Sequence, residues 1–187
     1  MKTFLNQFAQ DPKECLINSI KEQKFAPAYI SYALGVISLY FAIKLNSLEQ
    51  ASFVAFIIAF VFWFLFNIIF NFILAALSNL FLEFAGYTKS NAAGIFIVLG
   101  LSQLILTLLI PWFLIKQAFE QTAEFTIPTV IIIFLLQIYF ILSLMKKVFE
   151  LPKIVSFLAF VFSFIAPFMA VIIFIIFSIS FISTLIG

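Results

Sequence analysis

The chain has 187 residues, of which 65% are hydrophobic, 19% aromatic and only 10% charged. A soluble domain is about one quarter charged, so this composition excludes a water-soluble globular protein. All ten basic residues are lysine, histidine is absent, and the stretches 51–82, 92–115, 125–145 and 154–186 contain no charged side chain. We therefore expect an integral membrane protein whose interior offers little for acid–base or metal chemistry.

The uncharged stretches are long enough to be transmembrane helices, which need roughly 20 residues to cross about 30 Å of hydrocarbon. A membrane β-barrel would instead show polar and apolar residues in alternation over roughly 10-residue strands. Segments such as IIAFVFWFLF and AVIIFIIF do not alternate. The sequence therefore predicts an all-α membrane bundle.

The first 25 residues are polar and contain a helix start signal. Asp11 fits an N-cap, Pro12 fits the first helical position, and Glu14 has the spacing of a capping box. The apolar side chains of the following helix fall mainly on one side. Two placements remain open: an amphipathic helix lying in the membrane interface, or a helix packed on the ends of the spans.

Five spans are predicted after this segment, giving a transmembrane domain over 26–187. Their ranges are 26–45, 51–83, 92–115, 128–145 and 154–186. The second has no Gly or Pro to divide it, and its roughly 48 Å of helix exceeds the membrane thickness, so it should tilt or project. Two prolines inside spans are candidate kinks, Pro111 and Pro167. The first span carries three tyrosines expected to act as interface anchors, namely Tyr29, Tyr32 and Tyr40.

The lysines predict an orientation. With a cytoplasmic N-terminus, the cytoplasmic segments hold eight of the ten lysines and the opposite segments hold Lys44 and Lys116. Positive residues favour the cytoplasmic side. We therefore expect a multi-pass protein of the bacterial inner membrane, with its N-terminus inside and its C-terminus outside.

Uncharged polar residues within the spans are the candidate functional residues. They are Asn67, Asn71, Ser78, Gln103, Thr107 and Gln137. At 100° per residue, those of the second span fall within about 40° of one another. We favour the interpretation that these polar stripes mark helix–helix contacts. The alternative is that they line a polar path or cavity for a solute or a lipid headgroup.

No enzyme signature is found. The chain has no histidine and no GxGxxG or GxxxxGK[ST] motif, and its lysines lie in the loops or at span ends. Cys15, the only cysteine, excludes an intrachain disulfide, and we interpret it as structural. We expect a non-enzymatic protein without cofactor, metal or nucleic acid.

Three segments resemble bacterial members of the Yip domain family. They are FAQDPKECLINSIKEQKFAPAYISYALGVISLY, EFAGYTKSNAAGIFIVLGLSQLILTLLIP and ILSLMKKVFELPKIVSFLAF. They are similar to that family's interfacial opening, its glycine-bearing loop with a third span ending in proline, and its basic loop before the fifth span. The resemblance implies five helices and a cytoplasmic N-terminus. Eukaryotic members interact with Rab-type GTPases and act in vesicle traffic.

Two functions are compatible with these features. The first is a membrane protein that acts by association with itself, with partner proteins or with lipids, in a role such as membrane organisation. The second is a transporter or permeation module for a small solute or lipid, using the uncharged polar stripes. A cavity at mid-membrane would favour transport, and close-packed stripes would favour association.

Overall fold

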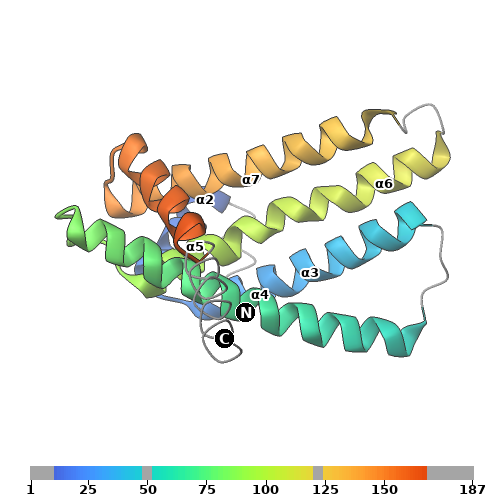
Figure 1. The fold of residues 1–187 in the computed structure, drawn as a ribbon, viewed down its shortest axis with the longest axis horizontal. Coiled ribbons are helices and arrows are strands. Elements are labelled where there is room, and N and C mark those ends of the chain that lie inside the picture. Colours follow the sequence, from blue (N-terminus) through green and yellow to red (C-terminus); the bar gives the residue numbers. More distant parts are fainter. Residues whose placement is uncertain (1–10, 48–51, 120–123, 168–187) are drawn as a thin grey trace, which may run out of the picture.

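The computed structural model describes residues 11–47, 52–119 and 124–167, which are helical with short connections and contain no strand (Figure 1). The helices are α2 (Pro12–Lys21), α3 (Phe25–Ser47), α4 (Phe53–Phe84), α5 (Ala92–Ser102), the 3₁₀ helix η1 (Gln103–Leu108), α6 (Leu109–Ala118) and α7 (Thr126–Phe149). An apolar helix over Lys153–Pro167 follows and is called the 153–167 helix below. The all-α prediction is confirmed for the described residues.

Four helical stretches of the described chain are long and apolar enough to cross a membrane. They are Phe25–Leu45, Phe53–Phe84, Ala92–Ala118 and Thr126–Phe149, and they coincide with the first four predicted spans. The protein is therefore a multi-pass helical membrane protein. The 153–167 helix opens the predicted fifth span; the remainder of that span, and any kink following Pro167, lie outside the described residues.

The α2 helix begins and packs as a capped amphipathic helix. The Asp11 carboxylate accepts a hydrogen bond from the Glu14 backbone N–H at 3.0 Å, which confirms the predicted N-cap. The apolar side of α2 is buried through Leu16 and Ile20, against α5 and α7. Of the two placements predicted for this helix, the structure favours packing on the ends of the spans.

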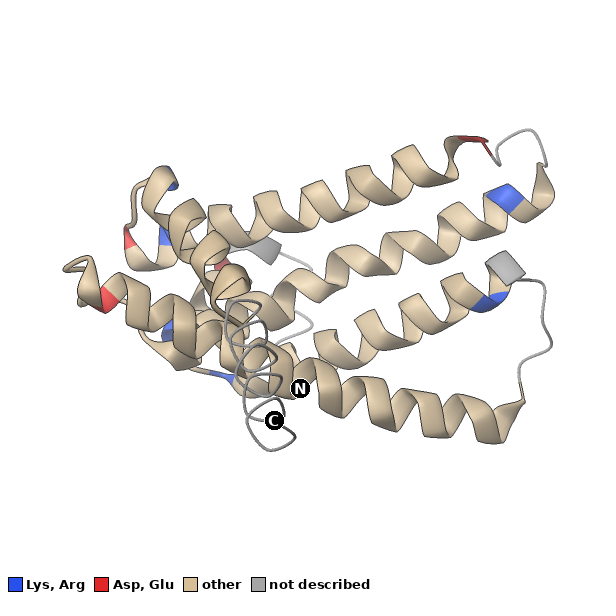
Figure 2. Cartoon of the chain, viewed as in Figure 1, with Lys and Arg blue, Asp and Glu red and all other residues tan. Residues whose placement is uncertain are grey.

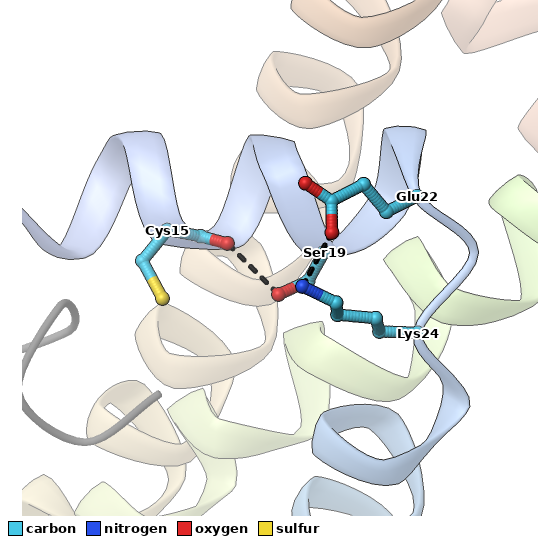
Figure 3. A network of polar contacts seen from close by, with 4 residues as sticks. All are labelled: Cys15, Ser19, Glu22 and Lys24. Carbon is cyan, nitrogen blue, oxygen red and sulfur yellow. Dashed lines mark hydrogen bonds and ion pairs between the residues drawn. The ribbon is translucent and has the colours of Figure 1, made fainter. Parts of the chain in front are cut away.

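Polar contacts stabilise the C-terminal part of α2 (Figure 3). The Ser19 hydroxyl donates to the Cys15 carbonyl oxygen at 2.8 Å, and Lys24 forms an ion pair with Glu22 just beyond the helix. The Cys15 side chain is buried. Burial raises the pKa of its thiol, Lys24 opposes this shift, and Asp11 adds to it. A buried thiol with a raised pKa is unreactive, which agrees with the structural interpretation of this cysteine.

The tightest packing joins α3 to α5 and η1, an interface that we call the α3 seam. A Cβ atom added to Gly100 would lie 2.8 Å from the Ala28 Cβ, and one added to Gly35 would lie 2.9 Å from the Gln103 Cβ. The hydroxyl of Tyr32, which is fully buried, donates to the Phe96 carbonyl oxygen at 3.0 Å. Close glycine contacts and a satisfied polar group therefore fix these helices against each other.

The third span changes helix type near its centre. Its α-helix gives way to the 3₁₀ helix η1 and resumes as α6. Pro111 lacks an N–H, and its ring crowds the carbonyl oxygen of the residue four positions earlier, Thr107, which lies within η1. We therefore attribute the tightened 3₁₀ turn that precedes Pro111 to this proline.

Charged side chains lie at the two ends of the bundle, and the helices between those ends carry none (Figure 2). Lys89 and Glu150, from the loop before α5 and the end of α7, form an ion pair at the α2 end. This hydrogen-bonded lysine lowers the pKa of the Glu150 carboxyl. The opposite end of the described bundle carries Lys44, Lys116 and Glu124.

Candidate functional site

A cavity of about 630 Å³ lies inside the bundle, between α3, α4, α5, η1, α7 and the 153–167 helix. This volume is typical of small-molecule sites, which range over about 300–1,000 Å³. Most of its lining is aliphatic or aromatic. The polar residues that line it are Tyr40, Asn67, Asn71, Ser102, Gln103 and Gln137.

The amide groups of the cavity lie far from both ends of the spans. Gln137 follows the first residue of α7, Thr126, by 11 positions and precedes the last, Phe149, by 12. At about 1.5 Å per residue, this is roughly 16–18 Å of helix from either end. Asn67 and Gln103 are also near the middle of their spans. The cavity therefore presents hydrogen-bonding groups at the depth of the hydrocarbon centre.

Gln103 is one of the four amide side chains that line the cavity. Its side chain is only 8% exposed, and it lies at the junction of α5 and η1, facing Gly35 across the α3 seam. Within the described chain its amide makes no hydrogen bond. The hydroxyl of Tyr40 is likewise buried and without a partner among these residues. Leaving a buried donor or acceptor unsatisfied costs about 1–3 kcal/mol. The Tyr40 hydroxyl is enclosed by protein atoms, whereas the Gln103 amide, which lines the cavity, is open to a ligand.

Asn67 and Asn71 form a ladder on one face of α4. The Asn71 side-chain amide donates to the Asn67 carbonyl oxygen at 2.8 Å and also contacts the Asn67 side-chain oxygen. Asn67 uses that oxygen as an acceptor, and its own side-chain N–H groups make no hydrogen bond within the described chain. The ladder therefore orients one amide donor group that remains available to a ligand.

Gln137 is held by a short relay from α7 to α5. Its side-chain amide donates to the Ser102 hydroxyl at 3.3 Å, and that hydroxyl donates to the Leu99 carbonyl oxygen at 2.6 Å. This is the type of contact that the helix-packing interpretation predicts. One predicted residue of the cavity thus serves helix association, while its neighbours in the cavity have spare hydrogen-bonding capacity.

Two predicted residues lie away from the cavity lining. The Ser78 hydroxyl is 3.5 Å from the Ala159 carbonyl oxygen, so it belongs to the contact between α4 and the 153–167 helix. The Thr107 hydroxyl donates to the Leu104 carbonyl oxygen of its own helix at 2.6 Å. For these two residues the interpretation as a possible polar path is not supported, because their hydroxyls are engaged by backbone.

Of the tyrosines predicted to anchor the first span at the interface, Tyr32 does not have that role. Tyr32 is buried beneath Phe96 and does not anchor an interface. Tyr40 lines the cavity. Tyr40 is four residues before Lys44, which placed it near a span end. It also lies four residues after Val36, another lining residue, and this shared helical phase was the only signal that its side chain faces the cavity. Ser102 was missed because a lone serine in an apolar helix carries no distinguishing pattern.

The lining offers hydrogen bonds and apolar contact but no charge. No charged residue is among the described residues around the cavity, and the described chain contains no group of three His, Cys, Asp or Glu side chains that could hold a metal ion. Such a site can bind and orient a neutral group. It contains no acid or base that could transfer a proton at neutral pH.

Comparisons with protein-family models, with curated proteins and with solved structures found no match to this chain.

Proposed function

We propose that this is a non-enzymatic membrane protein that acts by association, and that one of its partners is a lipid-like molecule held inside the helix bundle. The observation that carries this proposal is the convergence of amide side chains from three helical elements on one cavity at mid-span. Asn67, Gln103 and Gln137 come from α4, η1 and α7 and line the same space. A mostly apolar cavity with a few convergent polar groups is the usual form of a ligand site.

The polar stripes therefore support both interpretations made from the sequence, helix packing and ligand binding. Gln137 and Ser78 engage other helices or their carbonyl oxygens, which supports a packing role. Gln103 lines the cavity without a hydrogen-bond partner in the described chain, which supports ligand binding.

Transport of the bound molecule is a second candidate. The observation that favours it is the 3₁₀ helix η1, which interrupts the third span directly at Gln103. Mid-helix 3₁₀ stretches often mark hinges, so a change of helix type here would move a ligand-facing side chain. Uptake of the ligand into proteoliposomes tests this candidate.

The orientation and the resemblance to the Yip family are part of the proposal. Seven lysines precede or follow the spans at the α2 end within the described residues, against Lys44 and Lys116 at the other, which supports a cytoplasmic α2 end. Cysteine labelling at Thr88 and at Gln117, in otherwise cysteine-free protein, tests it: a membrane-impermeant reagent applied to intact cells should label only Gln117→Cys.

Blocking the cavity tests the binding function. Ala59 lines the cavity on α4, whereas Ala76 is on the exposed surface of the same helix. Ala59→Trp should remove co-purifying lipid detected by native mass spectrometry, and Ala76→Trp should leave it unchanged. Equal lipid content in both variants, with both proteins folded, contradicts the proposed function.

A further inference from the structure

We infer that the cavity takes a long-chain lipid with a small, uncharged head that carries a hydroxyl or carbonyl group, and that this head lies at the centre of the membrane. The inference rests on the proposed function, that the cavity binds a lipid-like molecule. It adds the chemical class of the ligand and the residues that select it.

The hydrogen-bonding capacity of the lining defines the head. The Gln103 amide, which lines the cavity, supplies both a donor and an acceptor. The Asn67 amide adds N–H groups oriented by its contact with Asn71. A hydroxyl or carbonyl oxygen accepts from such groups, and one small head can satisfy several of them.

The absence of charge among the described lining residues excludes an ionised head. No lysine is placed around the cavity to pair with a phosphate or carboxylate. Moving an unpaired ion into hydrocarbon is strongly unfavourable. A phospholipid would have to place its charged head roughly 16 Å from the nearer end of α7, which is the wrong depth for it.

The aromatic side chains of the lining provide a surface for the chain of the ligand. Phe66 stacks on Phe70 at 5.9 Å between ring centroids, and Phe70 meets Phe164 of the 153–167 helix edge-on at 6.2 Å. All three line the cavity. Rings in contact present a continuous apolar wall that packs against an alkyl or isoprenoid chain without demanding a particular headgroup.

The experiment uses the full chain in vesicles of phosphatidylcholine and a diazirine-bearing hexadecanol as the photoreactive probe. Peptide mapping should place the crosslinks on α4, η1 and α7. Unlabelled 1-hexadecanol should compete, and hexadecyl phosphate should not. Competition by 2-heptadecanone, which only accepts hydrogen bonds, distinguishes a carbonyl head from a hydroxyl head.

Two variants test the selecting residues. Gln103→Met keeps the length of the side chain and removes its hydrogen bonds, and it should weaken probe binding roughly 3- to 10-fold. Gln117→Met, in the same span but bonded to the Leu45 carbonyl oxygen outside the cavity, is the matched control and should bind normally. Tyr40→Phe removes a hydroxyl that protein atoms enclose, and it should bind the probe normally.

The outcomes separate the inference from the proposed function. Equal competition by hexadecyl phosphate, or unchanged binding in Gln103→Met, overturns the inference but leaves a lipid site in place. If neither probe nor competitor reaches the cavity peptides, and Ala59→Trp does not change lipid content, the proposed function fails as well.

Discussion

The α3 seam and the cavity are built from the same spans but satisfy their polar groups in different ways. In the seam, Gly35 and Gly100 allow backbones to approach so closely that a Cβ would lie less than 3.0 Å from its neighbours, and the Tyr32 hydroxyl is bonded. Across the cavity, the Tyr40 hydroxyl and the Gln103 amide lack partners in the described chain. One region is completed by the fold, and we propose that the other is completed by a ligand.

Gln103 connects the two regions. Its Cβ lies against Gly35 in the seam, while its side chain lines the cavity. Close packing therefore fixes the backbone from which the amide extends, which is how a rigid element positions a binding group. Filling the seam should lower the stability of the protein, and replacing the Gln103 amide with an apolar side chain should raise it.

The largest effect is expected where the seam is filled. Gly100→Val places new atoms where the Ala28 Cβ and the Tyr32 ring already lie within 2.8 Å of a Cβ position. Overpacking of this kind costs about 1–3 kcal/mol or more. Thermal unfolding in detergent should show a clear loss of stability, whereas Ala76→Val, at an exposed site of α4, should not. A stable Gly100→Val protein would mean that the seam is looser than described.

A smaller loss is expected when the polar group of the seam is removed. Tyr32→Phe deletes the hydroxyl that donates to the Phe96 carbonyl oxygen and should destabilise the protein by about 1 kcal/mol. Tyr139→Phe removes an exposed hydroxyl and is the matched control. The difference between the thermal unfolding midpoints of the two variants measures the contribution of the Tyr32 hydrogen bond to stability.

On the cavity side, removal of a polar group should raise the stability of the protein and not lower it. In delipidated protein, Gln103→Met removes an unpartnered buried amide, so stability should rise by up to about 1 kcal/mol. Addition of hexadecanol should stabilise the wild type more than the variant. If Gln103→Met is instead as destabilising as Tyr32→Phe, the two regions do not differ in the way proposed.

The smallest effect is expected outside both regions, at the ion pair of Lys89 and Glu150. Lys89 lowers the pKa of Glu150, so the pair stabilises the folded protein above the ordinary glutamate pKa, and this contribution is lost as pH falls through the lowered value. Both side chains are more than two-thirds exposed, so solvent weakens the effect. Glu150→Gln should slightly reduce the acid sensitivity of unfolding below about pH 4.5 and leave lipid content unchanged.

The membrane class and the first four spans could be predicted from sequence, because length, apolarity and missing charge are sufficient to identify a membrane helix. The N-cap at Asp11 was equally readable from local chemistry. The cavity was not predictable, because its existence depends on how far α4 and α7 are held apart by the helices between them. Helical phase grouped Asn67 with Asn71 and also with Ser78, but only tertiary packing separates the ladder from the serine that meets the 153–167 helix.

The uncharged lining has a practical consequence for the study of binding. Between pH 5 and 8, none of the lining residues in the described chain changes its charge, since the set contains no Asp, Glu, His, Lys or Cys. The inferred hydroxyl or carbonyl head does not ionise in that range either, so a pH-dependent affinity would indicate a ligand of another class. Measuring binding affinity as a function of pH therefore tests the chemical class of the ligand, because the charge of the lining stays constant.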